Sequence, residues 1–323
     1  GDQVEINCAM VKETKAHYDI VKTMRASILV LGPLLARFGY GSVSLPGGCA
    51  IGARPIDMHL NGLKQLGASI ELHDGYVVAK ANELLGATIE LPFPSVGATE
   101  NILMAAVFAK GESIIKNAAR EPEISDLGNF LKNIFPSLEI TGLGTSVIRI
   151  HGIDKNSPFK NITYQPIGDR IEALTMIMAA AMTTENEVKI VGFNPEHLGS
   201  AKDILEKMNV RMEILPNEGV VVKYSPHLKA VQVVTEPYPG FPTDAQAQLV
   251  ALCLKVPGIS QIEETIFENR FMHVPELIRM NAKLSIKEKT VTITGGSPLV
   301  SAPVMCTDLR ASAALVLASM LAK

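Results

Sequence analysis

Residues 168–191 read GDRIEALTMIMAAAMTTENEVKIV, and this stretch decides the fold. An Asp-Arg pair opens it, an apolar run fills residues 174–182, and residues 187–190 alternate between polar and apolar side chains. A helix that is apolar nearly all round is buried, and alternation with a period of two is typical of a strand. The stretch therefore predicts a buried helix that leads into a strand.

The same order of elements recurs on both sides of this stretch. Units begin near residues 96, 168 and 242, and each continues from a helix through strand, helix, strand and strand. We expect these further elements at residues 41–45, 56–66, 111–115, 124–134, 138–140, 147–150, 201–208, 211–214, 220–223, 259–262, 272–280, 284–286 and 290–293, with a second buried helix at 311–321. Self-similarity of this kind indicates a repeated supersecondary unit.

Polar anchor residues mark the period of the repeat. Thr99, Asp169, Asp244 and Asp308 are 70, 75 and 64 residues apart, and Arg25 precedes Thr99 by 74. The order of elements within a unit predicts α/β sandwich repeats with mixed sheets. An ordinary α/β sandwich with one central sheet is the alternative.

Composition limits the class of protein. The 323 residues suggest about two domains, with a boundary expected at residues 156–165, and the apolar fraction of 47% allows a sizeable core. A net charge of −3 gives no electrostatic case for nucleic acid or an anionic membrane. The longest apolar stretches, such as residues 28–36, are far shorter than the roughly 20 residues of a membrane span, and no secretory signal is visible. Both ends, Gly1 and Lys323, look cut, so we expect a piece of a longer chain.

Cysteine usage favours a reducing compartment. The cysteines lie far apart, at Cys8, Cys49, Cys253 and Cys306, and form no C-x-x-C pair. This spacing argues against a disulfide framework and against a zinc site. We therefore expect a cytoplasmic protein without a metal.

The loop at residues 45–55 is the most informative stretch for function. It holds three glycines and two prolines, and Arg54 follows Cys49 by five residues. A nearby positive charge lowers the pKa of a thiol and raises its reactivity, although a lone cysteine is more often an inert small apolar residue. The glycine spacing faintly resembles a phosphate loop, but Ala53 and Arg54 replace its Lys-Ser/Thr pair.

Arginines recur at predicted helix starts. Arg25, Arg170 and Arg310 each lie where free backbone N–H groups favour an anion, so their repetition suggests phosphate or carboxylate binding. The alternative is that they are solvated or paired with neighbours such as Asp169 and Asp308. Further candidate arginines are Arg54, Arg120 and Arg270.

A carboxylate within residues 241–246 is a candidate base. Asp244 opens a predicted helix, where an aspartate is usually only a cap. Close to several arginines in a closed site, it could instead take a proton from a hydroxyl. Further along, His273 and Glu276 lack the spacing of a zinc motif, and the remaining histidines are expected to be structural.

Together these stretches resemble the enolpyruvyl transferase family over essentially the whole chain. The motifs that carry the resemblance are residues 23–27, 46–55, 95–99, 117–124, 241–246, 264–277 and 307–312. The resemblance implies a two-domain inside-out α/β barrel, built of repeated βαβαββ units with buried helices. Its domains would be residues 1–163, with a mobile cysteine lid at about 44–56, and 164–323, truncated at the C-terminus. The family's N-terminal Lys-Asn pair and a C-terminal arginine are absent from these 323 residues.

The resemblance also implies roles for individual residues. Cys49 resembles a lid cysteine that protonates phosphoenolpyruvate and reacts with fosfomycin, and Asp244 resembles the base that deprotonates a sugar hydroxyl. Arg54, Arg270 and Arg310 resemble the arginines that hold phosphate and carboxylate, with Arg310 also catalytic. The implied contacts to the nucleotide sugar are Arg25, Arg54, Pro55, Ile56, Asp57, Met58, Phe93, Pro94, Ser95, Val96, Gly97, Asp244 and Ile266. Phe93 stands where some family members have a lysine.

The implied reaction is transfer of the enolpyruvyl group of phosphoenolpyruvate to the 3-hydroxyl of UDP-N-acetylglucosamine. Phosphate leaves by addition–elimination through a tetrahedral intermediate, and the product begins peptidoglycan synthesis. We expect no cofactor, no nucleic-acid or membrane partner, and a monomer. The alternatives are the sister reaction on shikimate 3-phosphate and a non-catalytic module that binds a sugar nucleotide.

Overall fold

The computed structural model describes residues 3–8, 10–22, 24–45, 56–183, 185–306 and 308–323, without the side chain of Arg25. The described residues form two compact units. Unit 1 contains residues 3–45, 56–119 and 124–164, and unit 2 contains residues 120–123 and 165–323. The assignment of residues 1–163 and 164–323 to two enolpyruvyl transferase domains stays a prediction, and most of the predicted lid lies outside the described residues.

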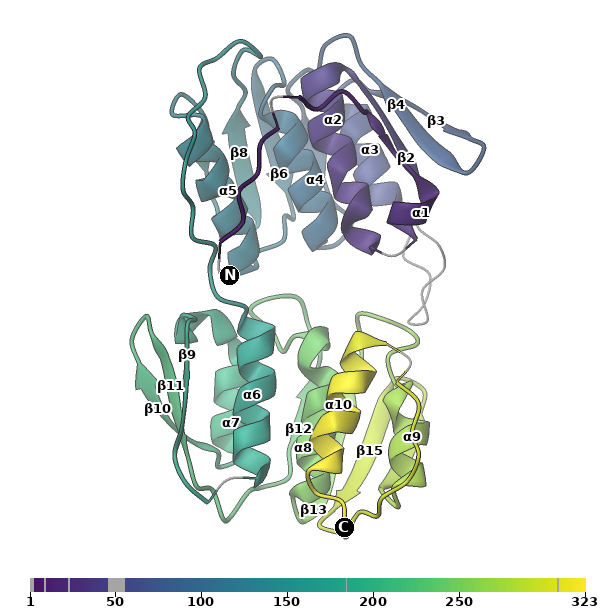
Figure 1. The fold of residues 1–323 in the computed structure, drawn as a ribbon, viewed down its shortest axis with the longest axis vertical. Helices are drawn as coiled ribbons and strands as arrows, with labels where there is room; N and C mark the ends of the chain where they lie inside the picture. The colour runs from purple at the N-terminus through teal and green to yellow at the C-terminus, as the bar shows by residue number, and fades with distance from the viewer. Residues whose placement is uncertain (1–2, 9, 23, 46–55, 184, 307) are drawn as a thin grey trace. The chain divides into compact units, whose positions relative to one another are not determined.

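Unit 1 holds two four-stranded mixed sheets (Figure 1). Their orders are β1-β2-β4-β3 and β5-β6-β8-β7, and in each the first pair is parallel while the other two pairs are antiparallel. The strands are β1 (Lys15–Ala16), β2 (Tyr40–Ser44), β3 (Ser69–His73), β4 (Tyr76–Lys80), β5 (Thr88–Glu90), β6 (Glu112–Lys116), β7 (Glu139–Thr141) and β8 (Val147–His151). The helices between them are α1 (Tyr18–Val21), the 3₁₀ helix η1 (Arg25–Val30), α2 (Leu31–Phe38), α3 (Asp57–Gln65), α4 (Val96–Ala106) and α5 (Pro122–Ile134).

Unit 2 repeats this topology. Its four-stranded sheet has the order β12-β13-β15-β14 with the same pattern of parallel and antiparallel pairs, and a three-stranded sheet has the order β10-β11-β9. The strands are β9 (Val188–Val191), β10 (Arg211–Leu215), β11 (Gly219–Lys223), β12 (Gln232–Val234), β13 (Gly258–Glu263), β14 (Lys283–Lys287) and β15 (Thr290–Gly295). The helices are α6 (Arg170–Thr183), η2 (Pro195–Leu198), α7 (Ser200–Lys207), η3 (Thr243–Ala245), α8 (Gln246–Lys255), α9 (His273–Arg279) and α10 (Leu309–Ser319).

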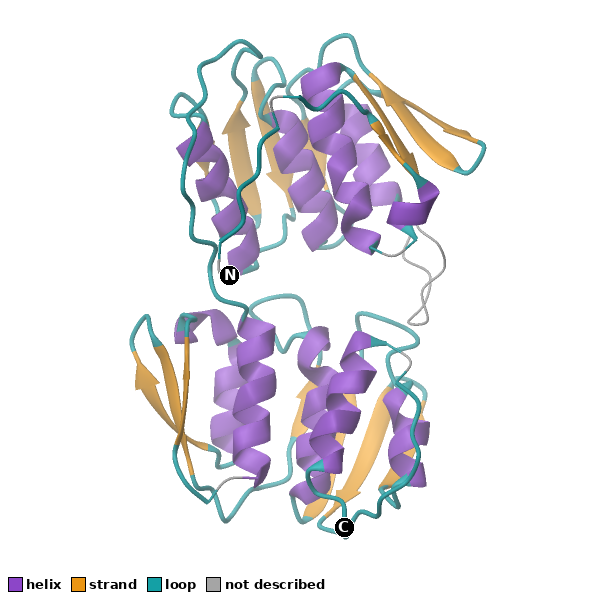
Figure 2. Cartoon of the chain, in the orientation of Figure 1, coloured by secondary structure: helices purple, strands orange, loops and turns teal. Residues whose placement is uncertain are grey.

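These sheets confirm the predicted repeat. Each four-stranded sheet is one βαβαββ unit, and the predicted elements agree with the structure to within one or two residues: the helix expected at 56–66 is α3, and that expected at 272–280 is α9. The alternative of one central sheet is wrong, since the described residues form four separate sheets. These sheets are open, so the described residues form no closed barrel, and the sheets instead flank the helices (Figure 2).

Each unit is organised around buried helices, as the apolar runs predict. In unit 1, α4 packs against α2 and α3; in unit 2, α8 packs against α6 and α10. Every residue of α8 from Gln246 to Leu254 is buried. The prediction is wrong for one face of α6 and one face of α10, where Met176 is 50% and Val316 is 57% exposed. These faces point away from α8, and burial on one side is enough to hold each helix.

Among the described residues, no helix is both long and apolar enough to cross a membrane. The same residues contain no cluster of acidic, histidine and cysteine side chains able to hold a metal ion.

We predict that Gly32→Ala destabilises unit 1. Gly32 lies in α2 where that helix meets α4, and a Cβ at this position would collide with the main-chain and side-chain oxygens of Asn101. Overpacking of this kind costs about 2 kcal/mol or more, which exceeds the gain in helix propensity. Urea unfolding should show the loss, with the exposed α3 substitution Lys64→Ala as a near-neutral control. Equal midpoints for Gly32→Ala and Lys64→Ala would contradict the packing of α2 on α4.

Candidate functional site

Unit 2 brings three predicted site residues together around one carboxylate oxygen. Asp244 lies in η3 directly before α8, Arg270 lies in the loop between β13 and α9, and Arg310 is the second residue of α10. Arg270 donates from Nη2 to Oδ1 of Asp244, and Arg310 donates from Nε to the same oxygen at 3.3 Å. Segments far apart in sequence thus place a carboxylate between two guanidinium groups.

Asp244 is not a helix cap, although that is the ordinary role of an aspartate at a helix start. The side chains at the start of η3 make no capping hydrogen bond, and the carboxylate of Asp244 turns to the arginines instead. Burial acts to raise the pKa of Asp244, but the charges of Arg310 and Arg270 outweigh it and hold the pKa below its ordinary value. The side chain is 43% exposed, so an ionised carboxylate remains open to a ligand.

Arg270 supplies a deeply buried positive charge. Its side chain is 4% exposed, and its guanidinium carbon lies 5.3 Å from the centre of the Phe267 ring. The described residues leave its Nε without a hydrogen-bond partner. A buried cation is costly unless anions pair with it, so this site favours an anionic ligand. Arg310 is 27% exposed and can approach that ligand from the solvent side.

His273 lies in the same region as a neutral side chain. The residue is 1% exposed, and burial is the main cause that lowers its pKa to about 4. The charge of Asp308 opposes this effect and that of Arg270 adds to it. At neutral pH, His273 therefore adds no second positive charge beside Arg270.

Glu264 connects the loop that carries Ile266 and Phe267 to Thr243, the residue before Asp244. The sequence patterns did not indicate Glu264 as a site residue. It is 2% exposed; its Oε1 accepts hydrogen bonds from the N–H groups of Ile266 (2.8 Å) and Phe267 (3.1 Å). Its Oε2 accepts from Oγ1 of Thr243 at 2.8 Å, next to Asp244. The signal was present in the period of two along β13, because Glu264 continues the inward-facing series of Ser260 and Ile262.

The expectation that free N–H groups at the starts of α6 and α10 bind an anion is wrong. Their first N–H groups are not free for an anion, because Asp169 accepts from Ile171 and Glu172, and Asp308 accepts from Arg310 and Ala311.

Arg170 takes the alternative role considered for it, as a paired structural residue. Its Nε donates to Glu123 at 3.0 Å, its guanidinium lies 5.2 Å from the ring of Tyr238, and its side chain is 8% exposed. The shared sequence context of Arg170 and Arg310 therefore leads to different partners.

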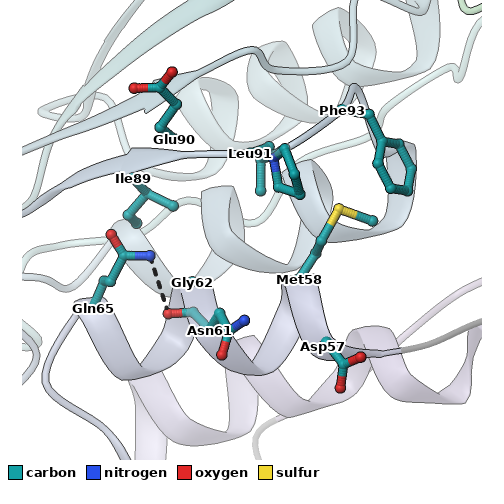
Figure 3. Close-up of a pocket in the computed structure, with 10 residues that line it drawn as sticks. Asp57, Met58, Asn61, Gly62, Gln65, Ile89, Glu90, Leu91 and Phe93 are labelled. Carbon is teal, nitrogen blue, oxygen red and sulfur yellow. Dashed lines mark hydrogen bonds between the residues drawn. The ribbon is translucent and has the colours of Figure 1, made fainter.

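Unit 1 holds a second group of predicted site residues beside a pocket of about 300 Å³. Asp57 and Met58 begin α3 on one side of it, and Phe93 lies on the other, as Figure 3 shows. The wall also includes residues that were not predicted: Asn61, Gly62, Gln65, Ile89, Glu90, Leu91 and Pro92. The pocket therefore combines an apolar lining with amide and carboxylate groups.

The remaining predicted contacts of unit 1 lie at the start of α4 or just before α3. Ser95 caps α4, since its Oγ accepts from the N–H of Ala98 at 3.3 Å. The half-buried residues Pro94, Val96 and Gly97 flank this cap, and Ile56 directly precedes α3.

Several predicted residues fall outside the part of the chain that the structure describes. These are Cys49, Arg54 and Pro55, together with the side chain of Arg25, whose backbone begins η1. Ile266 is described and lies in unit 2, on the loop that Glu264 holds. The roles of all these residues stay predictions.

We predict that Glu264 is needed to hold the Ile266 loop against η3. Glu264→Leu leaves three donors without their acceptor and should lower the free energy of unfolding by about 2–4 kcal/mol. Glu264→Gln keeps an oxygen for Ile266 and Phe267 and should lose clearly less. Denaturant unfolding of both variants measures the difference, and a Leu variant as stable as the Gln variant would refute this role.

Comparison with known proteins agrees with the sequence motifs. The model of the EPSP synthase (3-phosphoshikimate 1-carboxyvinyltransferase) family matches residues 1–323. The UDP-N-acetylglucosamine 1-carboxyvinyltransferase of Thermodesulfovibrio yellowstonii is 49% identical over 319 residues, which cover 99% of this chain and 75% of the relative. The enzyme of the same name from Trichlorobacter lovleyi is 51% identical over 322 residues, with coverage of 99% and 75%.

Solved structures share the fold at lower identity. The enolpyruvyl transferase NikO from Streptomyces tendae superposes with a TM-score of 0.85 at 23% identity, over 96% of this chain and 73% of that one. EPSP synthase from Acinetobacter baumannii gives a TM-score of 0.66 at 19% identity, over 92% and 71%. These likenesses confirm the predicted α/β fold of repeated units. With a family model and relatives that match nearly its whole length, the chain belongs to the EPSP synthase family of enolpyruvyl transferases.

Proposed function

We propose that this chain transfers the enolpyruvyl group of phosphoenolpyruvate to the 3-hydroxyl of UDP-N-acetylglucosamine and releases phosphate. The observation that carries the proposal is the 48–51% identity, over 98–100% of the chain, to relatives that all bear the name of this carboxyvinyltransferase. The reaction would be the first committed step of peptidoglycan synthesis, carried out in the cytoplasm by a monomer.

In this proposal Asp244 is the base, and the arginines hold the anionic substrate. Arg270, Arg310 and Arg54 bind the phosphate and carboxylate of phosphoenolpyruvate. The buried charge of Arg270 and the partly exposed charge of Arg310 support this role, because anion binding offsets the cost of burying a guanidinium. The proposed contacts to the nucleotide sugar are Arg25, Arg54, Pro55, Ile56, Asp57, Met58, Phe93, Pro94, Ser95, Val96, Gly97, Asp244 and Ile266.

The ion pairs of Asp244 suggest how a weak base becomes a stronger one. With both arginines bound to it, Asp244 has a lowered pKa and little tendency to accept a proton. An incoming phosphate or carboxylate competes for the guanidinium groups of Arg270 and Arg310 and brings negative charge close to Asp244. Both changes raise the pKa of Asp244. The carboxylate would therefore gain basicity when phosphoenolpyruvate is in place.

The chemistry then balances in two steps. The sugar oxygen bonds to C2 of phosphoenolpyruvate while Asp244 takes its proton and Cys49 delivers a proton to the C3 methylene. The new methyl group then returns a proton to the Cys49 thiolate as the double bond re-forms, and the C2–O bond breaks as phosphate leaves with the proton that Asp244 held. Arginines held in place before the reaction stabilise the developing charge better than water does.

We predict that purified protein releases phosphate from phosphoenolpyruvate with UDP-N-acetylglucosamine as acceptor and not with shikimate 3-phosphate. Asp244→Asn should lower kcat by about a hundredfold or more, as expected for loss of a general base, while calorimetry shows little change in sugar-nucleotide affinity. Asp74→Asn, at an exposed β3–β4 turn, is the matched control. Turnover with shikimate 3-phosphate but not with UDP-N-acetylglucosamine would overturn the choice of acceptor. A near-normal kcat in Asp244→Asn would remove Asp244 from the mechanism. Binding of the sugar nucleotide without any turnover would indicate the non-catalytic alternative.

We also predict that fosfomycin, in the presence of UDP-N-acetylglucosamine, alkylates Cys49. Cys8 and Cys306 are free and exposed, so they serve as internal controls for nonspecific thiol reactivity. Intact-mass and peptide analysis should locate a single adduct, which Cys49→Ser abolishes. An adduct on Cys8 or Cys306 in place of Cys49 would be evidence against the lid assignment.

A further inference from the structure

A buried side chain of α4, Asn101, hydrogen-bonds to segments that carry proposed nucleotide-sugar contacts of unit 1. Arg25 begins η1, Asp57 begins α3 and Val96 begins α4, so three helix starts carry these contacts. Asn101 is 0% exposed and lies one and a half turns into α4. Its amide hydrogen-bonds to Ile28 in η1 and to His59 in α3.

The hydrogen bonds of Asn101 fix its orientation without ambiguity. Its Oδ1 accepts from the N–H of Gly32 at 2.7 Å, and its Nδ2 donates to the carbonyl of Ile28 at 3.1 Å. A main-chain N–H can only donate and a carbonyl can only accept, so the amide cannot be turned over. The second N–H of Nδ2 then faces Nδ1 of His59 at 3.1 Å.

This geometry also determines the state of His59. Since Asn101 presents a donor, Nδ1 of His59 must be the acceptor, which leaves the proton on Nε2 of a neutral ring. Burial of the ring lowers the pKa of His59 to about 4, in agreement with that assignment. His59 lies on α3, two residues after Asp57, so its ring ties the start of α3 to α4.

The same ring also faces the start of α4 with Cε1, the carbon next to Nδ1, and with Nε2. A Cβ built on Gly97 would lie 3.1 Å from Cε1 and 3.4 Å from Nε2 of His59. Gly97 and Asn101 are four residues apart on α4 and so share one face, and the ring packs against this face from α3. A side chain at position 97 would require the ring of His59 to move by a few tenths of an ångström.

We propose that the Asn101–His59 pair is a positioning device that sets the spacing between the two sides of the sugar-nucleotide site, Asp57–Met58 and Val96–Gly97. This inference rests on the proposed function. His59 acts in it as a positioning residue through Gly97 and α3. Its role is separate from the proposed chemistry, which uses Cys49, Arg54, Asp244, Arg270 and Arg310.

A double-mutant cycle between His59 and Gly97 tests the proposal. His59→Ala should raise the Kd for UDP-N-acetylglucosamine about tenfold or more, since misplacement of a binding group by an ångström can cost that much, while the KM for phosphoenolpyruvate stays near wild type. Gly97→Ala should weaken sugar-nucleotide binding by a similar factor. In the His59→Ala background, where the ring no longer opposes the added methyl group, Gly97→Ala should cost less than about twofold, because residues in contact are not additive.

Controls separate positioning from general damage to the fold. His73→Ala removes an exposed histidine from the same unit and should change neither constant. His59→Gln keeps an acceptor for Asn101 and should restore part of the affinity; it also replaces His59→Ala in the cycle if the alanine variant does not fold.

The outcomes distinguish this inference from the proposed function. Wild-type protein that does not bind UDP-N-acetylglucosamine would overturn the proposed function. Wild-type binding with an unchanged Kd in His59→Ala, or with fully additive effects of His59→Ala and Gly97→Ala, would overturn the positioning role alone. An equal rise in the KM for phosphoenolpyruvate would show a purely structural role and overturn it as well.

Discussion

Unit 2 is organised around one carboxylate oxygen that two guanidinium groups share. Asp244 accepts from Arg270 and Arg310, and each residue comes from a different segment of the repeat. The pair with Arg270 offsets the cost of burying that cation, and the pair with Arg310 leaves a charge within reach of solvent. An anion that binds here shares these two guanidinium groups with Asp244. Substrate binding and the strength of the proposed base are therefore linked by a single set of hydrogen bonds.

The repeat explains why such residues meet. In each βαβαββ unit the chain leaves a strand and enters a buried helix, so polar residues at helix starts collect at corresponding places. Asp169 and Asp308 use their carboxylates to cap α6 and α10. Asp244 occupies the related place before α8 but has no capping bond, which frees its carboxylate for Arg270 and Arg310. The same local position thus serves stability at the starts of α6 and α10 and the proposed chemistry before α8.

Period and composition predicted many of the helices and strands, but they left the arrangement of the sheets open between repeated units and one central sheet. The apolar run at 174–182 locates α6 because much of that helix is buried, and the alternation in residues 187–190 locates β9 although most of its side chains are exposed. The exposed faces at Met176 and Val316 were not predictable, since an apolar side chain does not reveal what covers it. The family resemblance indicated Asp244 and Arg270, but not that they bond to each other.

Buried polar partners were the part that sequence patterns could not supply. Asn101 hydrogen-bonds to His59, 42 residues away in sequence, and to Ile28, 73 residues away. The helical period of α4 does not indicate that an asparagine there connects other segments. Arg170 and Arg310 follow similar local patterns, yet one pairs with Glu123 and the other with Asp244. Such choices depend on tertiary contacts, which periodicity does not encode.

The most direct test is an NMR titration of the Asp244 carboxyl carbon in protein labelled at aspartate, assigned by its loss in Asp244→Asn. In the free protein the pKa of Asp244 should lie below the ordinary aspartate value of 3.8. Saturating inorganic phosphate should raise it, because the anion draws Arg310 and Arg270 away and adds negative charge nearby. A pKa that starts at or above the ordinary value, or that phosphate leaves unchanged, would contradict the coupling between anion binding and the base.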